Sequence, residues 1–145
     1  MQETLKHKLH DYIRQNNPEI LLTLQVEKSV TKYISDKLNS LNDFVGELEK
    51  ENKPDYIIEE ICLNELTKDL RPSKFNYISN ILEEEFEFAH QQLSKLKLLQ
   101  YEAMNMIAHC EQIFESFNFS EENEDDKDLR YAVTGIISEY LDGNL

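Results

Sequence analysis

LRPSKFNYISNILEEEFEF, residues 70–88, combines a helix break, a helix start and a run of glutamates. Pro72 interrupts the element before it, and Ser73 is a residue type that caps helix N-termini. Apolar side chains then recur at helical spacing: Phe75, Ile78, Ile81, Leu82 and Phe86. The stretch therefore predicts an amphipathic helix that begins just after Ser73 and buries one face.

Amphipathic helical patterns extend from this stretch in both directions. The clearest runs through residues 30–48 and predicts one helix of about six turns. Residues 90–117 predict another long helix. The segment EILLTLQV, residues 19–26, is ambiguous, and we favour a short helix or an irregular buried link over a strand. The remaining predicted helices cover residues 5–13, 57–70 and 129–141.

The composition supports an all-α fold. The chain has three Gly and three Pro in 145 residues, which leaves few turns for a sandwich or a barrel. Hydrophobic residues make up 40%, enough for a core, and the length is typical of one domain. We therefore predict a compact all-α bundle of five to seven helices in a single domain, residues 1–145, with an acidic loop at residues 118–127.

The net charge of −14 is unevenly distributed. Residues 1–50 carry seven Lys and Arg against eight Asp and Glu, whereas residues 51–145 carry eight against twenty-one. Such a negative field repels phosphate backbones and anionic lipid surfaces. We therefore expect no direct nucleic-acid partner and no membrane partner. The field favours cationic partners and solubility.

The cysteines and the apolar runs bear on the cellular compartment. Cys62 and Cys110 lie far apart within apolar helical patterns, so we expect two reduced, buried thiols. The beginning of the chain, MQETLKHKLHDYI, lacks the apolar segment of a signal peptide. No apolar run approaches the roughly 20 residues of a membrane span. We therefore expect a cytoplasmic protein.

Residues for catalysis or cofactor binding are not indicated. A di-iron bundle needs two Glu-x-x-His motifs, and the chain has one, Glu87 to His90. The three glycines stand alone, so no phosphate-binding loop is predicted, and no nucleophile elbow occurs. SEENEDDKDLRY, residues 120–131, lacks the glycine of a calcium loop. We expect no catalytic, cofactor or metal residues and no enzyme; an enzyme of unrecognised type is an open alternative.

Two acidic clusters support a different alternative. Glutamates gather on the predicted helix at residues 83–87, and acidic residues crowd positions 121–128. Rows of carboxylates can imitate the phosphates of a DNA duplex and occupy the basic cleft of a nucleic-acid enzyme. An acidic DNA mimic is therefore the alternative function. A solvated helix face and a loop that complements a helix dipole account for the same residues.

A basic and aromatic spot lies in the acidic half of the chain. Arg71 and Lys74 flank the predicted helix start, and Tyr77 follows one turn later. Phe75 and Tyr77 point about 200° apart on a helix, and Phe75 is in register with the apolar face. We therefore expect Tyr77 to be exposed and predict an interface at Arg71, Lys74 and Tyr77 for a protein partner or a second copy. Ion pairing of both cations with nearby carboxylates is the alternative.

Three segments carry a resemblance to a known family: EICLNELTKDLRPSKFNYISNILEEEF (60–86), HCEQIFESFNFSEE (109–122) and DLRYAVTGIISEYLDGNL (128–145). The chain resembles a family of small uncharacterised helical proteins from gut-dwelling anaerobic bacteria, some of them linked to conjugative elements. The matching residues are Leu70, Ser73, Lys74, Phe75, Glu85, Phe86, Cys110, Phe114, Thr134 and Gly135. The resemblance implies a helical fold, a bacterial cytoplasmic setting and no known catalytic residues. We therefore expect a non-enzymatic bacterial accessory protein that acts through protein–protein interaction.

Overall fold

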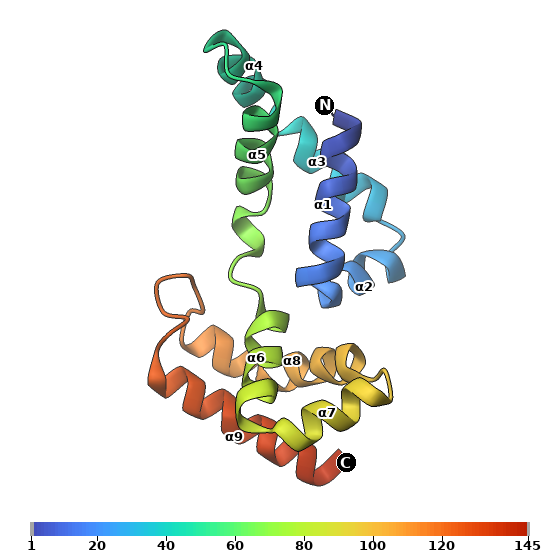
Figure 1. Cartoon of the computed structure of the whole chain (residues 1–145), viewed down its shortest axis with the longest axis vertical. Coiled ribbons are helices and arrows are strands. Elements are labelled where there is room, and N and C mark those ends of the chain that lie inside the picture. The colour runs from blue at the N-terminus through green and yellow to red at the C-terminus, as the bar shows by residue number, and fades with distance from the viewer. Residues whose placement is uncertain (1, 145) are drawn as a thin grey trace. The chain divides into compact units, whose positions relative to one another are not determined.

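The computed structural model describes residues 2–144, and within that range it is helical without strands (Figure 1). The helices are α1 (Gln2–Asn16), α2 (Pro18–Val26), α3 (Val30–Asn39), α4 (Asn42–Lys50), α5 (Asp55–Leu66), the 3₁₀ turn η1 (Lys68–Leu70), α6 (Lys74–Glu85), α7 (Glu87–Lys95), α8 (Leu99–Ser116) and α9 (Lys127–Asn144). The all-α prediction is confirmed. The described residues form nine α-helices, more than the five to seven predicted.

The chain divides into two compact units, residues 1–71 and residues 72–145. The first unit holds α1 to α5 and η1, and the second holds α6 to α9. Each unit encloses its own cluster of buried apolar side chains. A single domain over residues 1–145 stays a prediction.

The first unit is built around α1, which packs against α2, α3 and α5 (Figure 1). Leu5, Leu9 and Ile13 recur every four residues, so they lie on one face of α1, and all three are buried. Pro18 opens α2, because a proline at the first helical position loses no hydrogen bond. The buried Asn17 side chain donates a hydrogen bond to the Leu70 carbonyl at 3.2 Å and ties this corner to η1.

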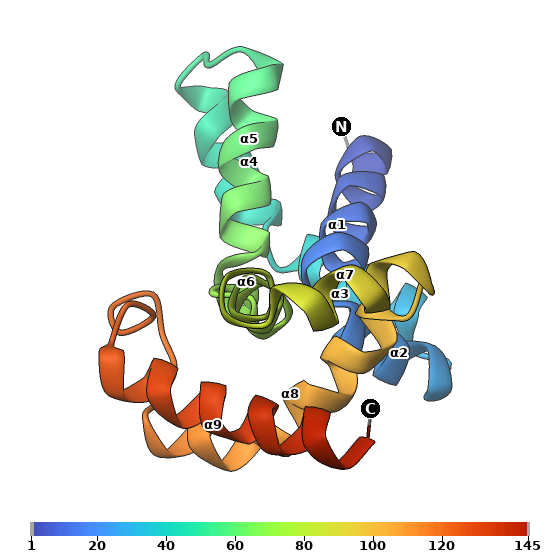
Figure 2. The same cartoon turned by 60° about the horizontal axis from the view of Figure 1, so that its bottom comes forward.

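The second unit consists of α8 and α9 packed along each other, with α6 against both (Figure 2). Ser73 caps α6 as predicted, since its hydroxyl accepts a hydrogen bond from the Asn76 amide at 3.0 Å. The inner face of α6 buries Ile78, Ile81 and Leu82. By contrast, Leu93 is the one buried residue of α7.

The single helix predicted for residues 30–48 is wrong, because the chain breaks into α3 and α4 at Ser40 and Leu41. The Ser40 hydroxyl donates to the Lys37 carbonyl at 2.6 Å, and such bonds compete with the helical ladder. Asn39 and Asn42 flank the break, and asparagine is a poor helix former. The apolar register continued through this break and concealed it.

The long helix predicted for residues 90–117 is also divided, at residues 96–98. Lys97 adopts the left-handed conformation, with φ of 60°, and the Leu98 amide donates to the Leu93 carbonyl at 2.9 Å. This is the hydrogen bond of a Schellman motif, in which glycine is the usual left-handed residue. Because a lysine takes that place here, the sequence contains no visible stop signal. Leu96 consequently lies outside the core, with 64% of its surface exposed.

Residues 117–126 connect α8 to α9 and include most of the acidic segment. The Asn123 side chain organises this connection: it accepts from the Ser120 amide at 2.8 Å and donates to the Phe117 carbonyl at 2.7 Å. Asp126 accepts a hydrogen bond from the Leu129 amide at 3.0 Å. Asp126 is therefore the N-cap of α9, and one acidic residue of the cluster has a defined structural role.

Candidate interaction surface

Arg71 is the last residue of the first unit and follows η1 in an extended conformation. Its guanidinium donates to the carbonyls of Asn64 at 3.1 Å and Thr67 at 3.4 Å, near the C-terminus of α5. A cation at this position donates hydrogen bonds to carbonyls that have no partner within the helix. Arg71 also lines a shallow pocket of about 470 Å³ whose wall includes Tyr12 and Glu60.

Lys74 is the first residue of α6 and is half-buried. Its ammonium lies 3.1 Å from the Glu111 carboxylate on α8 and 5.4 Å from the centre of the Phe114 ring. The ion pair and the ring contact hold the side chain against α8. For Lys74, the structure therefore agrees with the alternative given above, in which the cation pairs with a carboxylate of the chain.

Tyr77 is not exposed, and that expectation was wrong. Its ring packs edge-on against Phe114, with ring centres 5.8 Å apart, and against Phe119, at 5.1 Å. Phe119 belongs to the connection after α8, so this connection packs against α6 at Tyr77. Burial raises the pKa of the Tyr77 phenol above its ordinary value, and its hydroxyl lacks a hydrogen-bond partner among residues 2–144. Tyr77 thus packs against the second core as a partly buried residue.

The three predicted interface residues belong to two separately packed units. The Arg71 guanidinium donates two hydrogen bonds within the first unit. Lys74 instead forms an ion pair with Glu111 on α8, and the Tyr77 ring packs against Phe114 and Phe119. Their role as one interface stays a prediction. Within the second unit, Lys74 and Tyr77 serve the packing of α6 on α8.

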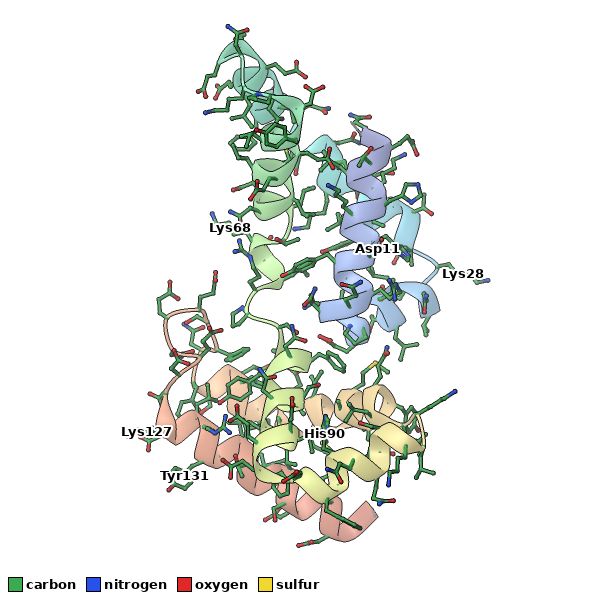
Figure 3. All side chains as sticks on the ribbon, in the orientation of Figure 1. Asp11, Lys28, Lys68, His90, Lys127 and Tyr131 are labelled. Atoms are coloured by element: carbon green, nitrogen blue, oxygen red, sulfur yellow. The ribbon has the colours of Figure 1, made fainter. Side chains whose placement is uncertain are left out.

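A second basic and aromatic group lies at the start of α9, and the sequence analysis did not identify it. Arg130 pairs with Glu84 at 2.8 Å and with Glu85 at 3.3 Å, which joins α9 to the end of α6. Lys127 and Tyr131 project from the same turns (Figure 3), and Tyr131 is 79% exposed. Arg130 and Tyr131 follow Lys127 by three and four residues, and this spacing in the sequence indicates that they share one helix face. Arg130 neutralises part of the glutamate row, which weakens the resemblance of that row to a DNA backbone.

The most unusual surface of the second unit lies on and after α7. Residues 88–101 contain no Asp or Glu, although the unit carries fifteen of them against five Lys and Arg. Four large apolar side chains of this segment are exposed: Phe88, Leu96, Leu98 and Tyr101. Lys95 and Lys97 are exposed among them. We call these six residues the α7 surface. The predicted long helix concealed this surface, because that helix placed Leu96 on a core face.

The titratable groups of the core are held in their neutral forms. Cys62 and Cys110 are free and buried, as predicted. Burial, with a smaller effect of Glu111, raises the pKa of the Cys110 thiol to about 12, so it is a poor nucleophile. The Tyr140 hydroxyl hydrogen-bonds the Glu102 carboxylate and links α9 to α8; burial and this bond raise its pKa. Within residues 2–144 no three His, Cys, Asp or Glu side chains gather as metal ligands would.

None of the helices in the described range is long and apolar enough to span a bilayer. No curated protein and no solved structure matches the chain. The family described as Domain of unknown function (DUF1896) matches residues 4–145, which include both compact units. The match confirms the predicted kinship with an uncharacterised family. A source in gut anaerobes and a link to conjugative elements stay predictions. The chain is thus a member of the DUF1896 family.

Proposed function

We propose that this protein is a non-enzymatic bacterial accessory protein that acts in the cytoplasm by binding another polypeptide through the α7 surface. The observation that carries this proposal is the composition of residues 88–101: four exposed large apolar side chains and no carboxylate, in a unit whose net charge is −10. The family resemblance supports the bacterial setting.

The physical basis is the cost of leaving apolar surface in water. Single exposed apolar residues are normal, but several that lie close together mark interaction sites. The centres of protein interfaces are depleted of charged residues and enriched in aromatic ones. The four apolar residues of the α7 surface include two aromatic ones and have no carboxylate among them, whereas Lys95 and Lys97 match the polar rim of such a site.

Site-specific photocrosslinking in cells tests this function. A photoreactive amino acid at position 96 should yield a discrete protein adduct of the full chain. The matched control is position 26, because Val26 also lies at the end of a short helix and is 75% exposed. Absence of adducts from positions 88, 96 and 98, or equal adducts from position 26, would contradict the proposed function.

The same experiment separates the other candidates. If Arg71, Lys74 and Tyr77 form the interface, the variant Arg71→Glu/Lys74→Glu should lose the adducts; their retention would count against that site. If the chain acts as an acidic DNA mimic, duplex DNA should compete with the captured protein, and binding should weaken steeply with salt.

A further inference from the structure

A cavity of about 230 Å³ lies in the first unit, where α1 meets the break between α3 and α4. Three buried leucines form its floor: Leu5, Leu38 and Leu41. The half-buried Val45 adds to the wall. Ligand sites are concave and mostly apolar, with a few polar groups that orient the ligand. The floor of this cavity therefore suits a hydrocarbon group.

The mouth of the cavity is polar and carries one charge. Gln2 and Asn42 line it with side-chain amides and Glu49 with a carboxylate, and all three residues are exposed. Glu49 is the only charged residue among the described residues that line the cavity. Among residues 2–144 no lysine or arginine pairs with its carboxylate, whereas Glu51 nearby pairs with Lys53 at 3.5 Å. The mouth therefore places an uncompensated negative charge beside the apolar floor.

Gly46 forms part of the cavity wall and is the central residue of α4. Glycine inside a helix lowers its stability relative to alanine. A Cβ atom at position 46 would meet no heavy atom within 4 Å outside its own helix, so alanine would fit. Gly135 in α9 also has space for a Cβ, but Gly135 is exposed, whereas Gly46 is half-buried. Gly46 thus keeps open a space that a better helix former would narrow.

We propose that this cavity binds a small aliphatic ammonium compound, with its hydrocarbon chain on the leucine floor and its ammonium group at Glu49. Apolar cavities of about 150 Å³ hold a six-carbon ring, so this one has room for a chain of about six carbons. The amide oxygens of Gln2 and Asn42 are acceptors for the ammonium protons. The site belongs to the first unit and the α7 surface to the second, so this inference does not depend on the proposed function.

Amide chemical shifts of the isotopically labelled full chain test the site, with n-hexylammonium as the probe. The amides of Leu41, Val45 and Gly46 should shift saturably, with a Kd on the order of 1 mM for a ligand of so few atoms. n-Propylammonium, three methylenes shorter, should bind at least about tenfold more weakly, because each buried methylene contributes roughly fourfold. n-Hexanoate should also bind more weakly than n-hexylammonium, because its charge has the same sign as Glu49.

Two pairs of variants locate the chain and the ammonium group. Gly46→Leu should abolish binding because it fills the cavity, and Gly135→Leu, the matched control on an exposed helical glycine, should leave binding unchanged. Glu49→Gln should weaken n-hexylammonium binding up to about fivefold at low salt and leave n-hexanol binding unchanged. Glu47→Gln is the control for charge, since Glu47 is an exposed carboxylate of α4 outside the cavity lining.

The side chain of a lysine in another polypeptide offers the same chemistry as a free amine. Nα-acetyl-lysine N-methylamide distinguishes the two sources when it is compared with n-butylammonium, which has the same hydrocarbon chain. Binding at least as tight as that of n-butylammonium indicates a lysine side chain, and weaker binding indicates a free amine.

Three results would overturn the inference. The first is the absence of saturable shifts at about 20 mM n-hexylammonium, well above the expected Kd. The second is undiminished binding by Gly46→Leu; if that variant unfolds the first unit, the comparison of Glu49→Gln with Glu47→Gln decides. The third is an equal effect of those two glutamine variants, or n-hexanoate binding as tightly as n-hexylammonium, either of which would exclude an ammonium compound as the ligand.

Discussion

The two units have cores of the same size but of different quality. Among the described residues each buried cluster contains twelve side chains, yet nine of those in the second unit are completely inaccessible, against two in the first. The second unit contains two helices of 18 residues that pack along each other, whereas α2 to α5 of the first unit have 9 to 12 residues. Long paired helices bury each other's side chains along most of their length, whereas short helices leave a larger share of their side chains exposed at the helix ends. We infer that the second unit is the more stable part of the chain.

The largest expected effect is a core truncation in the second unit. Phe114→Ala removes a ring that contacts Tyr77 and Phe119, and should cost about 3–5 kcal/mol of unfolding free energy. Leu48→Ala, at a site of the first core that is 8% exposed, should cost nearer 2 kcal/mol, the lower end of the usual range. Hydrogen exchange measures both, since it reports opening free energies for each unit separately. Equal costs would remove the proposed difference between the cores.

The next effect is a loss of stability at high pH. Cys110 has its pKa raised from an ordinary value near 9 to about 12, so the folded state keeps a proton that the unfolded state releases. Its contribution is therefore complete below about pH 9 and declines between pH 9 and 12, by up to about 1.4 kcal/mol per pH unit. Cys110→Ala should flatten this part of the profile in denaturant titrations. An unchanged slope would show that the thiol ionises freely.

A smaller effect distinguishes structural from solvated residues in the acidic connection. Asp126→Ala removes the N-cap of α9 and should cost about 1 kcal/mol. Asp125→Ala is the matched control, an exposed carboxylate one residue earlier, and should change stability by less than about 0.5 kcal/mol. Thermal unfolding resolves this difference. Equal effects would mean that the charge near the helix start, rather than the capping hydrogen bond, stabilises α9.

The candidate surfaces were harder to predict from the sequence than the fold. Arg71, Lys74 and Tyr77 lie close together in the sequence, which suggested a shared surface. However, Phe119, forty-two positions after Tyr77, determines whether the Tyr77 ring is exposed. Likewise, the exposure of Leu96 depends on the left-handed conformation of Lys97, which no glycine marks. Contacts between distant residues and stops without glycine leave no local pattern to read.

Local sequence patterns establish that this protein is helical, where α6 begins, and that both cysteines are buried. These features follow from helical spacing of apolar residues, from the Ser73 cap and from the scarcity of glycine and proline, all of which act over a few residues. How these patterns divide the described residues into nine α-helices and two cores depends on tertiary contacts. Tertiary contacts also make Tyr77 partly buried and leave Leu96 exposed, because exposure depends on which distant segment covers a side chain.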